Sequence, residues 1–236
     1  MMILSQEEIT RVAYEYENRS AEELLTWCLK QFEDKMSLAT SFGAEDMALT
    51  DILLRIRPDA HIFTLDTGRL PEETYRVWQQ TEEKYATRVQ PFFPDTKAVE
   101  EMVREQGPNL MYRSVELRRR CCHVRKVEPL NRALAGRQAW LTGLRREQAV
   151  TRGGVGKIEC DTTHDIVKIN PLADWTEKMV WDYLREHQVP YNELHDRSYP
   201  SIGCAPCTRA IKATEDVRAG RWWWESPEKK ECGLHK

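Results

Sequence analysis

The chain has 236 residues, of which 41% are hydrophobic and 31% charged, and its formal net charge is −3. This composition supports a buried core and excludes a wholly disordered chain, and the length suits one large domain with or without a tail. No run of about 18 apolar residues is present, and the first ten residues already carry Glu7 and Glu8, so we expect no membrane segment, no secretory signal and a cytoplasmic protein.

Two helices are expected within the first 35 residues, because a capping box opens each of them. In Ser5–Glu8 and again in Ser20–Glu23, a serine hydroxyl and a glutamate carboxylate can satisfy the first free amides of a helix reciprocally. Acidic side chains are frequent in this region. Residues 1–50 carry ten acidic and four basic side chains, a local sum of −6.

From residue 36 onward, strand-like apolar segments alternate with helical patterns. Strands are expected at 36–40, 61–66, 88–93, 139–144 and 166–169. Helices are expected at 44–57, from Pro71 onward, at 95–106, 124–135 and 176–187. This alternation predicts an α/β fold with a mainly parallel sheet and helices on both of its faces. We expect this domain to span residues 1–213, followed by a flexible C-terminal tail over 214–236, where the pattern fades.

The turn after the first expected strand has the character of an anion site. Ser41-Phe42-Gly43-Ala44-Glu45-Asp46 leads from a strand into a helix, and free amides at a helix start bind anions. It resembles the SGGxDS pyrophosphate loop of the nucleotide alpha-hydrolase superfamily in altered form. Phe42 replaces a glycine, and Glu45-Asp46 stands in place of Asp-Ser. We expect the altered loop to disfavour a triphosphate, although a nucleotide with fewer charges could still fit.

Positive charge is concentrated in the middle of the chain. Residues 113–157 carry twelve basic and three acidic side chains, a local sum of +9. The acidic balance of the whole chain argues against a general nucleic-acid binder, but such a stretch can focus its field on a small anion. A solvated helix face is the alternative interpretation.

Four of the seven cysteines occur in two close pairs. Cys121 and Cys122 are adjacent, and Cys204 and Cys207 form a CxxC motif. Two such pairs can supply four thiolates to zinc or to an iron–sulfur cluster. Neighbouring side chains on a helix diverge by about 100°, which favours a cluster with irons at different corners over one small ion. A structural zinc, or buried thiols with a redox-active CxxC, are the alternatives.

Cys232 stands apart, near the C-terminus, in the segment Glu231-Cys232-Gly233-Leu234-His235. Neighbouring cations, among them His235, lower a thiol's pKa and raise its thiolate fraction. On a tail, this cysteine could act as a nucleophile that meets first a substrate and then a protein reductant.

Together these motifs resemble the assimilatory sulfonucleotide reductases. The tandem cysteine in Arg120–Lys126, the CxxC and the terminal Glu-Cys-Gly-Leu-His are similar to the iron–sulfur branch of that family, which reduces adenosine 5′-phosphosulfate (APS). The segments 65–70 and 143–148 resemble further family blocks. The branch that reduces the 3′-phosphorylated nucleotide (PAPS) lacks the four cluster cysteines, so their presence points to APS.

The resemblance implies a role for each matching residue. Cys232 would attack the sulfur of APS, release AMP and carry a thiosulfonate, from which thioredoxin would free sulfite. A [4Fe–4S] cluster would be held by four ligands: Cys121, Cys122, Cys204 and Cys207. The residues expected around the phosphosulfate are Lys126, Arg152, Arg218, Arg221 and His235. The residues expected around the nucleotide are Ser41, Gly43, Leu65 and Gly143. Family analogy also suggests a homo-oligomer, and we expect no nucleic-acid partner.

Three other interpretations remain open. One is a PAPS reductase, and another is an ATP-using, AMP-forming sulfur transferase of the same superfamily. The transferase predicts an intact pyrophosphate loop, which the substituted residues disfavour. The third is a zinc-stabilised interaction module without catalysis.

Overall fold

The computed structural model describes residues 4–149 and 152–226, and it divides into two compact units. Of the described residues, 4–63, 76–90, 136–149 and 152–192 form the first unit, and 64–75, 91–135 and 193–226 form the second. Each unit therefore gathers segments that lie far apart in the sequence. The domain boundary expected at residue 213 stays a prediction.

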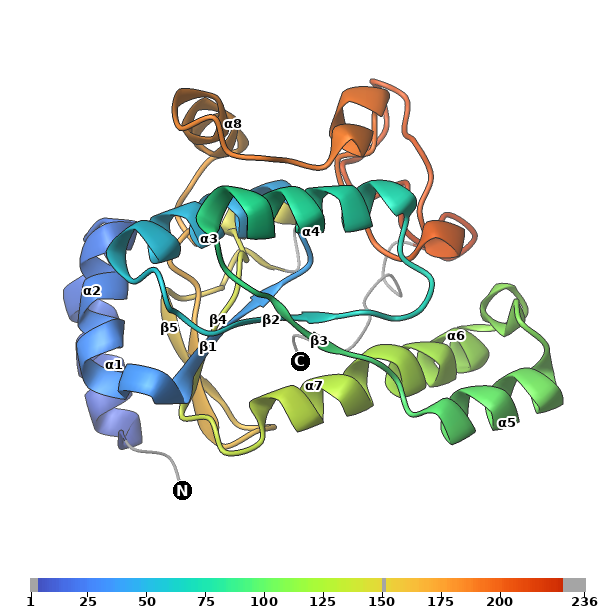
Figure 1. Cartoon of the computed structure of the whole chain (residues 1–236), viewed down its shortest axis with the longest axis horizontal. Helices are drawn as coiled ribbons and strands as arrows, with labels where there is room; N and C mark the ends of the chain where they lie inside the picture. Colours follow the sequence, from blue (N-terminus) through green and yellow to red (C-terminus); the bar gives the residue numbers. More distant parts are fainter. Residues whose placement is uncertain (1–3, 150–151, 227–236) are drawn as a thin grey trace. The chain divides into compact units, whose positions relative to one another are not determined.

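The N-terminal helices of the first unit begin as the capping boxes predict. Helix α1 spans Gln6–Tyr16 and α2 spans Ala21–Phe32, and both boxes close in both directions. In the first of them, the Ser5 hydroxyl accepts from the Glu8 amide at 3.2 Å. The other helices that lie wholly or mainly in this unit are α3 (Ala44–Ile56), α4 (Glu72–Tyr85) and α8 (Glu177–Glu186). Helix α1 contacts β5, and α8 contacts α3 (Figure 1).

Six strands form one sheet in the order β3-β2-β1-β4-β6-β5. Their bounds are β1 Met36–Thr40, β2 Ile62–Leu65, β3 Gln90–Phe92, β4 Ala139–Leu141, β5 Ile158–Asp161 and β6 Ile166–Ile169. Strand β4 pairs in parallel with both β1 and β6, whereas β5 pairs antiparallel with β6. The expected α/β fold with a mainly parallel sheet is thus confirmed.

Two features of the sheet differ from the expectation. Strand β5 was not anticipated, since its apolar–polar alternation extends over only four residues. It pairs with β6 across a turn in which the Asp161 carboxylate accepts from the Thr163 and His164 amides. Strand β4 ends at Leu141, before the expected Leu144. Beyond it, the Thr142 hydroxyl bonds to Asn170 and to the Leu144 amide, and such local side-chain bonds compete with a ladder.

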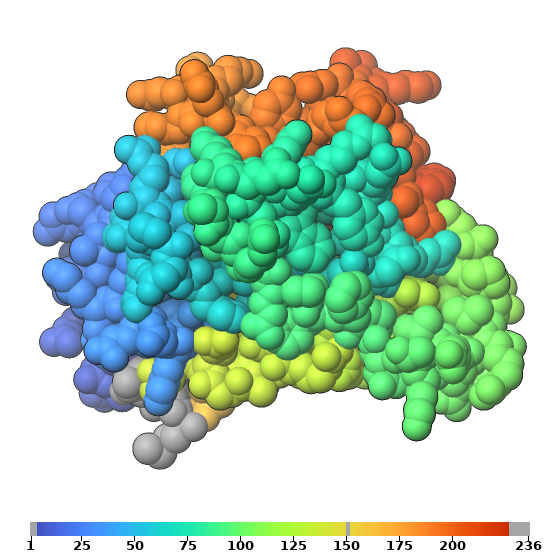
Figure 2. All heavy atoms as spheres, in the orientation of Figure 1, coloured from blue at the N-terminus to red at the C-terminus, as the bar shows by residue number. Residues whose placement is uncertain are grey.

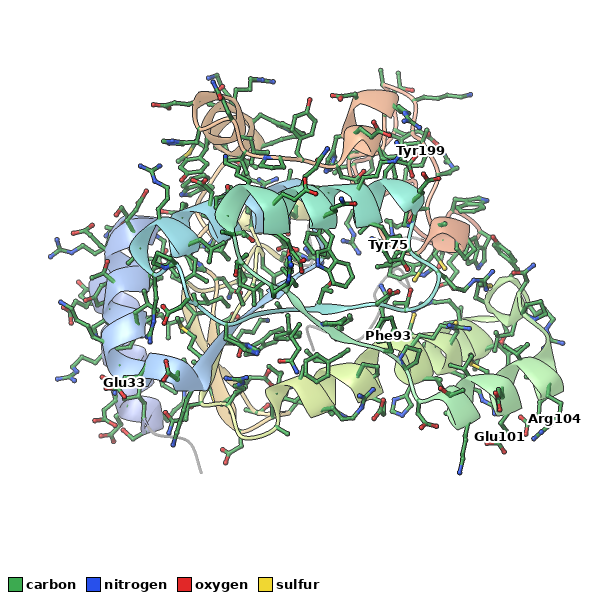
Figure 3. All side chains as sticks on the ribbon, viewed as in Figure 1. Glu33, Tyr75, Phe93, Glu101, Arg104 and Tyr199 are labelled. Carbon is green, nitrogen blue, oxygen red and sulfur yellow. The ribbon has the colours of Figure 1, made fainter. Side chains whose placement is uncertain are left out.

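The second unit contains a run of helices that carries part of the basic stretch. Helix α5 spans Thr96–Gln106, α6 spans Val115–Cys122, and α7 spans Glu128–Leu134. A π-helical segment, His123–Val127, joins α6 to α7. The helix expected at 124–135 is therefore the end of a longer run. Figure 2 shows the exposed atoms of α5 in green, and Figure 3 shows Glu101 and Arg104 projecting from this helix.

The core of the first unit is formed largely by α2, α3 and β1. Both α2 and α3 contact β1, and Leu24, Leu38 and Met47 are fully buried. Burying such a side chain contributes roughly 1.5–3 kcal/mol. This packing fixes the carboxyl end of β1 and the start of α3, which flank the loop at residues 41–43. Across 4–149 and 152–226, no helix combines the length and the hydropathy that a bilayer crossing requires.

Candidate functional site

In the first unit, the loop between β1 and α3 is closed by its own carboxylate. Asp46 lies in the first turn of α3, and its Oδ2 accepts from the Ser41 amide at 2.6 Å and from the Ser41 hydroxyl at 2.7 Å. The Gly143 amide, which follows β4, also donates to Asp46. The structure thus brings together Ser41, Gly43 and Gly143, which we expected near a nucleotide, and places Asp46 at their centre.

The approach of Gly143 to Asp46 leaves no room for a side chain. A Cβ atom built on Gly143 would lie 2.3 Å from Asp46 Oδ1 and 3.1 Å from the Asp46 backbone nitrogen. Burial raises the pKa of Asp46 to about 6, although the hydrogen bonds from Ser41 and Gly143 favour its charged form. Hydrogen bonds therefore hold the Asp46 carboxylate in place, while its burial disfavours the charged form.

Phe42 keeps the backbone shape that a glycine would have in this loop. Its φ is +58°, in the left-handed region, and its ring is buried and stacks on Trp78 with centroids 5.6 Å apart. A left-handed conformation costs a residue with a Cβ roughly 1–2 kcal/mol, which the buried ring offsets. Phe42 therefore adopts in this turn a backbone conformation that glycine favours.

The segment after β4 is tied to the same loop by ion pairs and amide contacts. The Arg145 guanidinium is buried and donates to Glu45 Oε1 at 2.8 and 2.9 Å. Gln148 donates to the Gly143 carbonyl and accepts from the Arg145 amide. Arg152, an expected anion ligand, donates to Gln148 Oε1 at 2.5 Å, and the same Gln148 side chain donates to the Gly143 carbonyl.

In the second unit, all four cysteines of the two pairs come together. Cys121 and Cys122 end helix α6, and Cys204 and Cys207 flank a single 3₁₀ turn. Cys122, Cys204 and Cys207 pack together with the side chains of Trp222 and Trp224 in one hydrophobic group. Cys121 is near enough to Cys204 for their charges to interact. The π-helical segment that follows Cys122 is a geometry often found at functional sites.

Cations and hydroxyls set the ionisation of these thiols. Burial opposes ionisation of Cys204, but the Lys126 charge and a hydrogen bond with the Thr67 hydroxyl, 3.3 Å away, outweigh it and lower its pKa. Burial, followed by the charges of Cys204 and Cys122, raises the pKa of Cys207 to about 12. Thiolates at these positions therefore repel one another, and a bound cation would reduce that repulsion.

Hydrogen-bond donors around the thiols test whether a sulfur-rich cluster fits. The indole nitrogens of Trp222 and Trp224 and Nε of Arg125 are buried donors that find no acceptor within the described part of the chain. Buried donors are normally satisfied, and the sulfides of an iron–sulfur cluster are acceptors. Across 4–149 and 152–226, no group of three or more His, Cys, Asp or Glu side chains is arranged to hold a metal ion, so the fit is judged on the hydrogen-bond donors. The donor set fits an iron–sulfur cluster.

The turn after β2 contributes to this site through its backbone and polar side chains. Asp66, one residue after Leu65, accepts from the Gly68 amide at 2.8 Å and from the Tyr75 hydroxyl, whose ring is labelled in Figure 3. Arg125 donates to the Thr67 carbonyl at 2.6 Å. This turn therefore connects the expected nucleotide residue Leu65 with the cysteine site of the second unit.

The C-terminal segment holds two of the expected anion ligands. Arg221 is buried, lies over the Trp222 ring at 4.7 Å, and influences both Cys204 and Cys207. Arg218 shares its turn, since the Arg221 amide donates to the Arg218 carbonyl at 3.0 Å. Cys232 and His235 lie outside the described residues, so their expected roles stay predictions.

Some residues of these sites escaped the sequence analysis. Arg118 lies one helical turn before Cys122 and donates to its sulfur, and the same spacing rule that singled out Lys126 would have found it. Thr67 and Arg125 lie within motifs already noted, but only the fold places them beside Cys204. Asp46 was noted as a departure from the loop pattern, without the contacts that it makes.

Comparisons with known proteins agree with this geometry. Residues 35–210 match the model of the phosphoadenosine phosphosulfate reductase domain. An adenosine 5′-phosphosulfate reductase of Allochromatium vinosum is 55% identical over 217 residues, which cover 92% of this chain and 84% of the relative.

Solved structures show the same relationship. The PAPS reductase of Candida auris, in a phosphate complex, superposes with a TM-score of 0.75 at 30% identity, over 86% of this chain and 97% of that one. Yeast FAD synthetase shares the fold alone, with a TM-score of 0.59 at 14% identity over 89% of this chain and 70% of its own. Since the family match covers most of the chain and a curated relative shares more than half of the aligned residues, the chain is an enzyme of the phosphoadenosine phosphosulfate reductase family.

Proposed function

We propose that this enzyme reduces adenosine 5′-phosphosulfate to sulfite and AMP in sulfate assimilation, with thioredoxin as the reductant. The observation that carries the proposal is the gathering of Cys121, Cys122, Cys204 and Cys207 beside Lys126 and Arg221. Its relatives named adenosine 5′-phosphosulfate reductases, among them the 55% identical protein of Allochromatium vinosum, support the choice of substrate.

The reaction proceeds in two displacements. The thiolate of Cys232 attacks the sulfur of the substrate, and the sulfur–oxygen bond breaks with its electron pair staying on the AMP oxygen. The enzyme then carries a thiosulfonate. A thioredoxin thiolate attacks the Cys232 sulfur and releases sulfite, and the second thioredoxin thiol resolves the mixed disulfide. Thioredoxin supplies both electrons, and Cys232 returns as a thiol.

Fixed cations assist the first displacement. AMP leaves as a dianion, so Lys126 and Arg221, already placed beside the cysteine site, stabilise the charge that develops on its phosphate. Arg152, Arg218 and His235 extend this anion-binding set. In the nucleotide part of the proposal, Ser41, Gly43, Leu65 and Gly143 contact the adenosine.

The proposed cofactor is a [4Fe–4S] cluster on the four cysteine ligands. When bound, it supplies a charged, polarisable centre that adjusts the field near Lys126 and donates no electrons. Two observations support this assignment: the Thr67 hydroxyl lies 3.3 Å from the Cys204 sulfur, and Trp222 and Trp224, whose indole donors are buried without an acceptor, pack with Cys122, Cys204 and Cys207.

Intact mass measurement after incubation with APS, without reductant, tests this mechanism. We expect a mass increase of one SO₃ group that maps to Cys232 and disappears when reduced thioredoxin is added. Cys232→Ser should give no adduct, whereas the matched variant Cys160→Ser should react like the wild type. An adduct on another cysteine, or its absence in active wild-type protein, would overturn the proposed nucleophile.

A second candidate is reduction of PAPS. The PAPS reductase of Candida auris favours this candidate, because that protein is 30% identical to this chain and the match covers 86% of this chain. Measuring kcat/KM for both nucleotides decides between the two. We expect APS to be preferred, and an equal or higher value for PAPS would reverse the assignment.

A further inference from the structure

The carboxylate of Asp46 lies where the loop between β1 and α3 would otherwise receive an anion. It accepts from the Ser41 amide and hydroxyl at 2.6 and 2.7 Å, and the Gly143 amide donates to it. We propose that Asp46 is an internal anion that closes this loop to phosphate groups and so determines which nucleotides the enzyme rejects.

The donors that Asp46 occupies are those of an anion site. Two backbone amides and one hydroxyl converge on a single carboxylate at the start of a thirteen-residue helix. Backbone amide and hydroxyl hydrogens that converge on one point form a concavity that binds anions. With the carboxylate in place, these donors are already satisfied. An incoming phosphate would have to displace Asp46 or accept its repulsion.

Close packing against Gly143 keeps the Asp46 carboxylate in this position. Gly143 approaches Asp46 Oδ1 so closely that a Cβ atom would lie 2.3 Å from it. Displacement of the carboxylate would remove the acceptor that the Ser41 amide and hydroxyl and the Gly143 amide share. The internal anion therefore competes strongly with an external one.

The backbone of the loop still has the shape of an anion-binding turn. Phe42 holds a glycine-like φ of +58°, so the phenylalanine does not by itself remove the turn. Glu45 is engaged by Arg145 through two hydrogen bonds and does not supply the loop's internal acceptor. These two observations assign the closure to Asp46 among the three altered positions.

Titration with inorganic pyrophosphate, followed by calorimetry, tests the inference directly. We expect Asp46→Ser, which restores the residue of the unaltered loop, to bind pyrophosphate on the order of tenfold more tightly than the wild type. Asp46→Glu keeps the charge and should show no such gain. Glu147→Gln removes one exposed carboxylate from the segment after β4, and it controls for a general change of charge.

The outcomes separate cleanly. Equal pyrophosphate affinity in the wild type and in Asp46→Ser would overturn the inference, as would an equal gain in Glu147→Gln. If Asp46→Ser does not fold, as judged by circular dichroism, Asp46→Asn takes its place with the same expected direction. The probe contains neither sulfur nor adenosine, so the result is independent of whether APS is the substrate.

Discussion

Arg118 and Glu225 form a buried, bidentate ion pair within the second unit. Nε and Nη2 of Arg118 donate to the two Glu225 oxygens at 3.0 and 2.9 Å, and the side chains are 0% and 3% exposed. The same guanidinium donates to the Cys122 sulfur and lies over the Trp222 ring at 4.8 Å. One arginine therefore connects a proposed cluster ligand with the segment that leads toward Cys232.

Breaking this ion pair should strongly destabilise the protein. We expect Glu225→Gln to lower the free energy of unfolding by about 3–5 kcal/mol, because Arg118 would keep an uncompensated buried charge. Urea unfolding measures the loss. Removing the exposed pair by Glu23→Gln, whose partner Arg19 is more than half exposed, should cost no more than about 1 kcal/mol. Similar losses for the two variants would contradict the buried character of the first pair.

Asp46 should make the stability depend on pH in a definite direction. Burial raises its folded-state pKa to about 6 from an ordinary value of 3.8, so folding favours the protonated form. This contribution is complete below about pH 4 and is lost as the pH rises through 6, a change of at most about 3 kcal/mol. The stability of the wild type relative to Asp46→Asn should therefore fall between about pH 4 and 6 and change little above that range. A pH-independent difference would argue against a raised pKa.

Gly143→Ala should reveal the close approach between the residue that follows β4 and Asp46 at the start of α3. The new methyl group would meet Asp46 Oδ1 at 2.3 Å, and overpacking of this kind costs about 1–3 kcal/mol. In an Asp46→Ser background, part of that loss should disappear, because the carboxylate oxygen is gone. Gly154→Ala is the matched control, since its Cβ meets no atom within 4 Å. Thermal unfolding of the four variants gives the comparison, and strict additivity would mean that the two residues do not interact.

Loss of any proposed cluster ligand should remove the metal. Cys121→Ser, Cys122→Ser, Cys204→Ser and Cys207→Ser should each purify with little iron and acid-labile sulfide, because one thiolate of four is missing. Cys28→Ala and Cys160→Ser should keep the wild-type content of both, since neither lies among the four thiols. Stoichiometric zinc in the wild type, without sulfide, would refute the cluster.

Local sequence patterns were sufficient for most of the secondary structure. The capping boxes at Ser5 and Ser20 placed the starts of α1 and α2, because a cap depends on residues three positions apart. Alternation of strands and helices predicted the mainly parallel sheet, because a helix between two strands allows them to run in the same direction. Strand β5 was missed because four alternating residues are too short a pattern to identify a strand, and they become one by pairing with β6.

The sequence by itself determined the chemistry that is available: two cysteine pairs, a basic stretch and an altered loop. Only the tertiary structure decided which of these groups meet. It brought Cys204 to Thr67, 137 positions away, paired Arg118 with Glu225 across 107 positions, and seated the Asp46 carboxylate on the Ser41 and Gly143 amides. Such contacts form because strand order, helix packing and burial bring distant segments together, and no local pattern encodes that distance.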